Sequence, residues 1–164
     1  MRLDAARDGK AWALAALYRS LHAKLLRYVA AREPRLAEAV TEQAWRDVSR
    51  GLHAFEGTEA EFTAWTFALA RRQLVKAREL APDEDSDDDA SLARFDRRTQ
   101  AALRRVAGLP EDEADVFLLR AVAGLTAEEV AWIVGKPRAV VHALQQRAIE
   151  RLVRRRAQST ELVA

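Results

Sequence analysis

The sequence predicts an all-α protein of two small helical domains joined by an acidic flexible linker. Apolar residues make up 49% of the 164 residues, Gly and Pro are scarce, and apolar positions recur at three- and four-residue spacing. From Pro82 to Asp89 this periodicity stops, and six of the eight residues carry carboxylates. We therefore expect domains at 1–80 and 99–156, an extended linker at 81–98, and a tail at 157–164 that frays.

The first domain is predicted to be a three-helix bundle. A first helix spans Trp12 to Ala31 and ends before Pro34, and a second spans about Leu36 to Leu52. Gly57 marks a turn, after which a third helix begins near Glu59 or Ala60 and becomes basic in its second half. The stripe expected to be buried in the first helix is Trp12, Leu14, Leu17, Leu21, Leu25 and Val29.

The second domain is predicted to end in a helix-turn-helix. One helix carries Leu103 and Val106, and another, from Glu111 to Val122, follows Leu109-Pro110. Thr126 and Glu129 have the spacing of a capping box, and Gly135 supplies a left-handed residue that ends a short helix. The buried stripe of the next helix is Val141, Leu144, Ala148 and Leu152, which leaves Arg138, His142, Gln145, Gln146 and Arg147 on or near the outward side.

Arg and Gln on that outward side suit two-point hydrogen bonding with purine edges in a major groove. The alternative is a helical hairpin whose polar face is merely solvated. The short Gly-Lys-Pro turn, the capping box and the paired glutamines favour DNA binding.

Composition argues against several functional classes. The chain has no Cys, and its three scattered His residues argue against a metal cluster. No phosphate loop or nucleophile–base pair occurs, so we expect no cofactor and no enzymatic activity. The uncharged run from Phe62 to Ala70 is too short to span a bilayer, and we expect a soluble, cytoplasmic protein without membrane insertion. The net charge of +2 divides into +4 for residues 1–80, −4 for 81–98 and +2 for 99–164.

Short motifs follow one another in order along the chain. They are Leu17-Tyr-Arg with Leu25-Leu-Arg-Tyr28, Ala37 to Trp45, Phe55-x-Gly57 with Phe62-x-x-Trp65 and Ala70-Arg71, and Leu109-Pro110 with Val116 to Arg120, Gly124 to Thr126 and Glu129 to Ala131. This ordered set resembles the extracytoplasmic-function (ECF) sigma factors of the bacterial sigma-70 family. The resemblance covers about Leu17 to Arg155 and implies a region 2-like bundle followed by a region 4-like helix-turn-helix.

The resemblance implies a promoter-specificity subunit that binds core RNA polymerase and promoter DNA. It places the second helix on the clamp coiled coil of the β′ subunit, through Glu38, Glu42, Gln43, Arg46 and Asp47, and it implies a contact with the β flap. An anti-sigma factor is a further partner that the family suggests. Without the resemblance, the same five residues would be interpreted as a solvated helix face.

The resemblance also assigns DNA-contacting residues. The minus-ten set is Phe55, Trp65, Arg71, Arg72 and Lys76, although the helical spacing of Trp65 and Phe67 favours a place in the core. The minus-thirty-five set is Arg138, His142, Ala143, Gln146 and Arg147. The acidic linker corresponds to a connector that lies in RNA channels, or else serves as a solubilising spacer.

Some residues depart from the family pattern. The segment from Glu111 to Asp115 is acidic where basic residues usually follow Leu-Pro, and Lys76 and Glu79-Leu80 replace an Asp and an Arg pair. Trp132 takes a position that is normally small. Two alternatives therefore stay open: a helix-turn-helix regulator that acts without polymerase, and a sigma-like interaction protein that does not open promoters.

Overall fold

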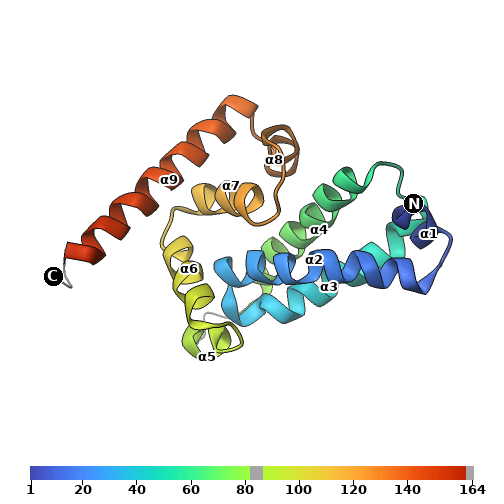
Figure 1. Ribbon diagram of the computed structural model, residues 1–164, viewed down its shortest axis with the longest axis horizontal. Coiled ribbons are helices and arrows are strands. Elements are labelled where there is room, and N and C mark those ends of the chain that lie inside the picture. Colours follow the sequence, from blue (N-terminus) through green and yellow to red (C-terminus); the bar gives the residue numbers. More distant parts are fainter. Residues whose placement is uncertain (82–86, 162–164) are drawn as a thin grey trace.

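The computed structural model describes residues 1–81 and 87–161, which form helices and no strand, in agreement with the predicted all-α class. The first group of helices is α1 (Arg2–Arg7), α2 (Ala11–Arg32), α3 (Ala37–Gly51) and α4 (Glu59–Leu80). Short 3₁₀ turns, Pro34–Leu36 and Leu52–Ala54, flank α3. Helix α1 was not predicted; it packs on α2 beside the turn that ends α3 (Figure 1).

The core of this bundle consists of side chains that recur at helical spacing. Leu17, Leu25 and Tyr28 of α2 are fully buried, as are Val48 of α3 and Phe62, Phe67 and Leu74 of α4. The prediction for Trp12 was wrong, because its side chain is 61% exposed in the first turn of α2. The buried stripe of α2 begins at the next residue, because Ala13 is fully buried and lies four residues before Leu17, whereas Trp12 falls on an adjacent, exposed side of the helix.

The second group contains α6 (Arg97–Ala107), α7 (Glu111–Ala121), α8 (Ala127–Val134) and α9 (Arg138–Glu161). Asp96 caps α6 by accepting a hydrogen bond from the Thr99 backbone N–H at 2.9 Å, and Pro110 precedes α7. The core is formed by Val116, Leu118 and Leu119 of α7 with Val130 of α8 and Val141 and Ala148 of α9.

One prediction about an irregular segment was wrong. Part of the expected extended linker is helix α5 (Asp88–Leu92), whose N-cap Asp87 accepts a hydrogen bond from the Ala90 backbone N–H at 3.1 Å. The carboxylates that indicated a flexible strip therefore also cap and begin a helix. Helix α9 continues through Glu161, and the fraying expected of the tail at 157–164 stays a prediction. The acidic residues at 82–86 lie outside the described part of the chain.

The two groups of helices pack against each other. Helices α6 and α7 contact α2, and α8 contacts the N-terminal half of α4. Figure 1 shows α7 between α9 and the α2–α4 bundle, while the C-terminal end of α9 extends away from it. This arrangement brings side chains from α7 and α8 onto the surfaces of α2 and α4.

Candidate nucleic-acid interface

The helix-turn-helix is built from local hydrogen bonds that the sequence predicted. Thr126 Oγ1 accepts a hydrogen bond from the Glu129 backbone N–H at 3.2 Å, and Glu129 Oε2 accepts one from the Thr126 backbone N–H at 2.7 Å. Gly135 ends α8 with a φ of 66° and a ψ of 32°, a left-handed conformation that only glycine adopts without strain. The capping box and the glycine cap therefore set the start and the end of α8.

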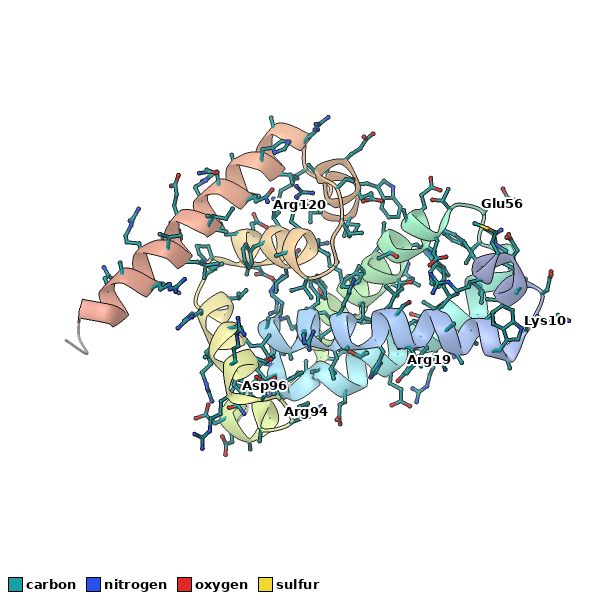
Figure 2. The ribbon with its side chains drawn as sticks, viewed as in Figure 1. Lys10, Arg19, Glu56, Arg94, Asp96 and Arg120 are labelled. Atoms are coloured by element: carbon teal, nitrogen blue, oxygen red, sulfur yellow. The ribbon has the colours of Figure 1, made fainter. Side chains whose placement is uncertain are left out.

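Helix α9 is held against α7 and α8 by apolar contacts and by one arginine. Val141, Leu144 and Ala148 are buried. Arg120 Nε donates to Gln145 Oε1 at 3.1 Å, and Arg120 Nη1 donates to the Leu125 carbonyl at 2.5 Å. Figure 2 labels Arg120 at this junction of α7, α8 and α9. Gln145, predicted to lie on or near the outward side, is half-buried, and its bond to Arg120 joins α9 to α7.

The opposite face of α9 carries the residues predicted to read the minus-thirty-five element, and all five are exposed: Arg138, His142, Ala143, Gln146 and Arg147. Their side chains follow the helix in i,i+4 contacts. Arg138 Nε lies 3.4 Å from His142 Nε2, and Arg147 Nε donates to the Ala143 carbonyl at 3.4 Å. Because these contacts are long, the guanidinium groups stay accessible. This face of α9 can therefore donate hydrogen bonds to a DNA groove while the helix stays intact.

The residues predicted to bind polymerase lie on one side of α3. Glu38, Glu42 and Arg46 are exposed, and Arg46 Nη2 donates to Glu42 Oε1 at 2.5 Å. Gln43 and Asp47 are half-buried. Asp47 Oδ2 accepts from Gln73 Nε2 of α4 at 2.5 Å, so Asp47 already helps to join α3 to α4.

One member of this surface is paired with the segment that follows α5. Glu38 Oε1 lies 2.5 Å from Arg94 Nη1. Figure 2 labels Arg94 below the bundle, beside α5. A protein that binds α3 through Glu38 must therefore displace Arg94. This displacement costs little, because an exposed ion pair contributes little to stability.

The predicted minus-ten residues are in two separate places. Phe55 and Trp65 stack with their ring centroids 4.9 Å apart at the N-terminal end of α4, and both are half-buried. Phe62 is fully buried beneath them. Phe67 is also fully buried, which supports the alternative that this aromatic group belongs largely to the core, while Trp65 keeps an exposed edge.

The three basic residues of that set differ in what surrounds them. Arg72 and Lys76 are exposed, and Lys76 lines a small pocket with Gln43 and Gln73, beside the surface predicted to bind polymerase. Arg71 is half-buried, and its Nε donates to Asp115 Oδ2 of α7 at 2.7 Å. Burial of Arg71 opposes its charge, but the bond to Asp115 and the charge of that carboxylate outweigh burial and raise the pKa of Arg71. In this conformation Arg71 Nε is bonded to Asp115, while the Arg71 side chain stays 31% exposed.

Asp115 is the centre of a buried cluster that the sequence did not reveal. Its carboxylate is 3% exposed and accepts from Tyr28 Oη at 2.6 Å and pairs with Arg32 Nη1 at 2.9 Å, in addition to Arg71. Burial, followed by the charge of Asp115 and the hydrogen bond to it, raises the pKa of Tyr28 well above its ordinary value. Tyr28 is therefore a phenol donor at any physiological pH. The only signal in the sequence was the unexpectedly acidic segment from Glu111 to Asp115.

A cleft of about 620 Å³ separates the N-terminal end of α4 from α8. Phe55, Trp65 and Trp132 supply aromatic surface, and Trp132 is 66% exposed. Four carboxylates surround them: Glu56, Glu61, Glu128 and Glu129. Glu61 Oε2 also accepts hydrogen bonds from Thr58 that begin α4, and these bonds lower the pKa of Glu61.

Among the described residues, no group of His, Asp or Glu side chains has an arrangement that could hold a metal ion. No helix in the described ranges is long and apolar enough to cross a membrane.

Comparisons with known proteins fit this geometry. Residues 99–152 match the family described as sigma-70, region 4. The chain is 28% identical over 168 residues to the ECF RNA polymerase sigma factor ShbA of Streptomyces griseus, and the match covers 88% of each protein. Its fold is similar to that of CnrH, solved in complex with the cytosolic domain of CnrY, with a TM-score of 0.68, 18% identity, and 93% of this chain and 92% of that chain covered.

Proposed function

This chain is a homologue of the ECF sigma factors of the sigma-70 family, and we propose that it is a promoter-specificity subunit of bacterial RNA polymerase. The observation that carries the proposal is the helix-turn-helix within the region 4 match, whose second helix presents Arg138, His142, Gln146 and Arg147 to solvent. A sigma factor selects where transcription starts and is not itself an enzyme, and this chain shows no positive sign of catalysis.

For minus-thirty-five recognition, we propose that α9 enters the major groove with its N-terminal half. Gln146 is suited to the edge of an adenine, Arg147 to a guanine or a phosphate, and Ala143 to a thymine methyl group. Arg138, in the first turn of α9, is placed to contact the sugar–phosphate backbone. The buried side of the helix, held by Arg120, keeps these donors in a fixed register.

Replacing Arg147 or Arg154 by Ala and comparing the DNA affinities of the two variants tests this position of α9 in the major groove. Arg147→Ala should weaken binding to a duplex minus-thirty-five element by roughly 5- to 150-fold, because one good base contact contributes about 1–3 kcal/mol. Arg154→Ala removes the same charge from an exposed position two turns further along α9 and should have a much smaller effect. Equal losses for the two variants at several salt concentrations would show that only overall charge matters.

For minus-ten recognition, we propose that the single strand follows α4, with a base against the exposed edge of Trp65 and phosphates near Arg72. Aromatic stacking contributes about 1–3 kcal/mol for each base, and basic side chains follow the backbone. For polymerase binding we propose the α3 surface of Glu38, Glu42 and Arg46, with Gln43 and Asp47 at its edge. Lys76 lies closer to this surface than to Trp65, and we assign it to polymerase or upstream DNA.

A protein inhibitor is a further proposed partner. CnrH, whose fold this chain shares, was solved in complex with the cytosolic domain of CnrY. Co-purification of this chain with an inhibitor that blocks its binding to core polymerase would support this. Full transcription activity in the presence of every protein that co-purifies would contradict it.

The decisive experiment is run-off transcription with purified core RNA polymerase on fragmented genomic DNA, with and without the protein. New RNA 5′ ends that share two spaced sequence blocks would establish a working sigma factor and reveal its promoter. Stable co-elution with core polymerase but no new 5′ ends would favour an interaction protein that does not open promoters. If neither new 5′ ends nor co-elution is found, the remaining candidate is a helix-turn-helix regulator that acts without polymerase.

A further inference from the structure

Helix α1 is attached to the segment that leads into α4. Leu3 and Ala6 of α1 are buried, and the helix contacts the 3₁₀ turn at Leu52–Ala54. Arg2 pairs with Glu59, the first residue of α4, although the two are 57 positions apart in the chain. These contacts place α1 beside the loop that connects the 3₁₀ turn to α4.

Arg7 of α1 makes three contacts at this junction, and two of them are with the loop. Its Nη2 donates to the Gly57 carbonyl at 2.9 Å, and its Cζ lies 5.7 Å from the centroid of the Phe55 ring. Its Nη1 donates to Asp4 Oδ1 at 3.1 Å, which holds the guanidinium in place. A cation within about 6 Å of an aromatic centroid is attracted to the ring, and the planar guanidinium can donate hydrogen bonds at the same time.

The backbone of the loop lies directly on the Phe55 ring. Gly57 has a φ of 154°, and a Cβ at this position would lie 3.0 Å from both Phe55 Cζ and Glu61 Oε2. Because the Gly57 backbone and the ring are in contact, a movement of one requires a movement of the other. Arg7, which binds both, therefore restrains the loop and the ring together.

Phe55 connects Arg7 to the side chain proposed to contact a base. Its ring stacks on Trp65 with the centroids 4.9 Å apart. On the side of α3 the indole is confined as well, since a Cβ at Gly51 would lie 2.9 Å from Trp65 Cζ2. Phe55, Glu56 and Trp65 line the same cleft, and Figure 2 labels Glu56 beside α1. The position of the loop therefore sets which edge of Trp65 a ligand meets.

We propose that Arg7 is a positioning residue of the minus-ten surface. This role rests on the proposed function, in which Trp65 contacts a base of the single strand. Arg7 itself does not touch the DNA: it holds the Gly57 carbonyl and the Phe55 ring so that Trp65 presents one fixed edge. Without Arg7 the loop populates other arrangements, and the apparent affinity for the strand falls with the fraction of molecules that stay competent to bind.

The first measurement follows the loop without any ligand. Labelling the protein with fluorotryptophan gives each Trp a fluorine NMR signal, and the signal that Trp65→Phe removes belongs to Trp65. In Arg7→Gln the Trp65 signal should shift or broaden, because the indole samples more than one environment. The signal of Trp45, which is buried against Tyr18 of α2, should stay unchanged and so shows that the rest of the bundle is folded.

The second measurement uses the DNA single strand of about 12 nucleotides that the wild-type protein enriches most from a random pool. Arg7→Gln should lower the affinity for this strand by about 5- to 30-fold, the range by which the loss of one or two charged contacts changes the ratio of two conformations. Arg7→Lys keeps the charge but not the planar fork, so it should recover little of the loss. It also serves in both measurements if Arg7→Gln does not fold. The matched control is Arg19→Gln, which removes the same charge from an exposed position of α2 and should change the affinity far less (Figure 2).

A double-mutant cycle tests whether Arg7 acts through Phe55. In a Phe55→Leu background, which has already lost the stacked ring, Arg7→Gln should lower the strand affinity much less than it does in the wild-type protein. The salt dependence of the affinity should be the same for the wild-type protein and Arg7→Gln, because Arg7 neutralises no phosphate. Arg72→Gln, at the position proposed to lie near phosphates, should weaken that salt dependence.

Four results would overturn the role of Arg7. They are an unchanged strand affinity in Arg7→Gln, an unchanged Trp65 signal in this variant, an equal loss of affinity in the Phe55→Leu background, and full recovery in Arg7→Lys, which would make Arg7 a direct phosphate contact. A random pool from which the wild-type protein enriches no strand would contradict the proposed minus-ten contact and, with it, the role of Arg7. A protein that selects a strand through Arg7 but gives no new transcripts with core polymerase would contradict only the proposed function.

Discussion

Replacing Tyr28 by Phe tests whether the buried cluster exists in solution. The substitution keeps the ring, which packs edge-on against Phe67 with centroids 5.6 Å apart, and removes only the hydroxyl that donates to Asp115 at 2.6 Å. Asp115 keeps Arg32 and Arg71, so the cost is that of one hydrogen bond to a charged group, about 1.5–3 kcal/mol, and not that of an unpaired buried charge.

Thermal and urea unfolding followed by circular dichroism measure this change. For a chain of this size, 1 kcal/mol shifts the melting temperature by about 2–4 °C, so the expected decrease is about 3–12 °C. The urea midpoint should fall while its m-value is unchanged, because the surface exposed on unfolding stays the same. Tyr18→Phe is the matched control: Tyr18 is partly exposed and stacks on His22, so its hydroxyl can be hydrated and the change should stay within about 0.5 kcal/mol.

The reasoning would be refuted if Tyr28→Phe lowered the melting temperature and the urea midpoint as little as Tyr18→Phe. That result would mean that the Tyr28 hydroxyl is hydrated in solution and that α7 does not lie against α2.

Three further predictions concern the caps, the packing and the ionisation of the same elements. Thr126→Ala should lower the free energy of unfolding by about 1 kcal/mol because it removes the capping box of α8, whereas Thr126→Ser should restore most of the loss in the same melting experiment. Gly51→Ala should lower the melting temperature because the added Cβ would lie 2.9 Å from Cζ2 of Trp65, whereas Ser49→Ala at an exposed position of α3 should not. In a phenolate absorbance titration, Tyr28 should stay protonated above pH ~10, the pKa of a tyrosine in an unfolded peptide. Because the folded-state pKa of Tyr28 is raised, its contribution to stability is complete below pH ~10 and is lost as the pH rises above that value; ionisation of Tyr28 near pH ~10 in folded protein would contradict this.

The sequence predicted the local structure well where neighbouring residues supply the interactions. The capping box of Thr126 and Glu129, the left-handed Gly135 and the starts of α4 and α7 all depend on partners within four residues, and all are confirmed. The family resemblance was equally accessible, because it depends on the order of such local motifs. The DNA-contacting and polymerase-contacting residues stay predictions, since the exposure of Gln146 or Glu42 is compatible with a solvated surface.

Contacts whose partners are distant in the chain were not visible in the sequence. Arg71 was proposed for a DNA phosphate, which stays a prediction, and only the structure shows that its Nε donates to Asp115, which follows 44 residues later. Gln145 was expected on or near the outward side, and only the packing of α7 brings Arg120 to it. Trp12 was expected in the buried stripe, but that stripe begins at Ala13, four residues before Leu17, and Trp12 is exposed.

The sequence by itself determined the longer helices, their caps, the helix-turn-helix and the resemblance to a known family, because hydrogen bonds and periodic contacts three or four residues apart are encoded locally. Tertiary structure alone decided which charges are accessible. The acidic segment of α7 looked like a departure from the family pattern until α2 and α4 were seen to supply Tyr28, Arg32 and Arg71 around Asp115. A charge in a sequence has no fixed role, because its energy depends on how much water and which opposite charges surround it once distant helices have packed.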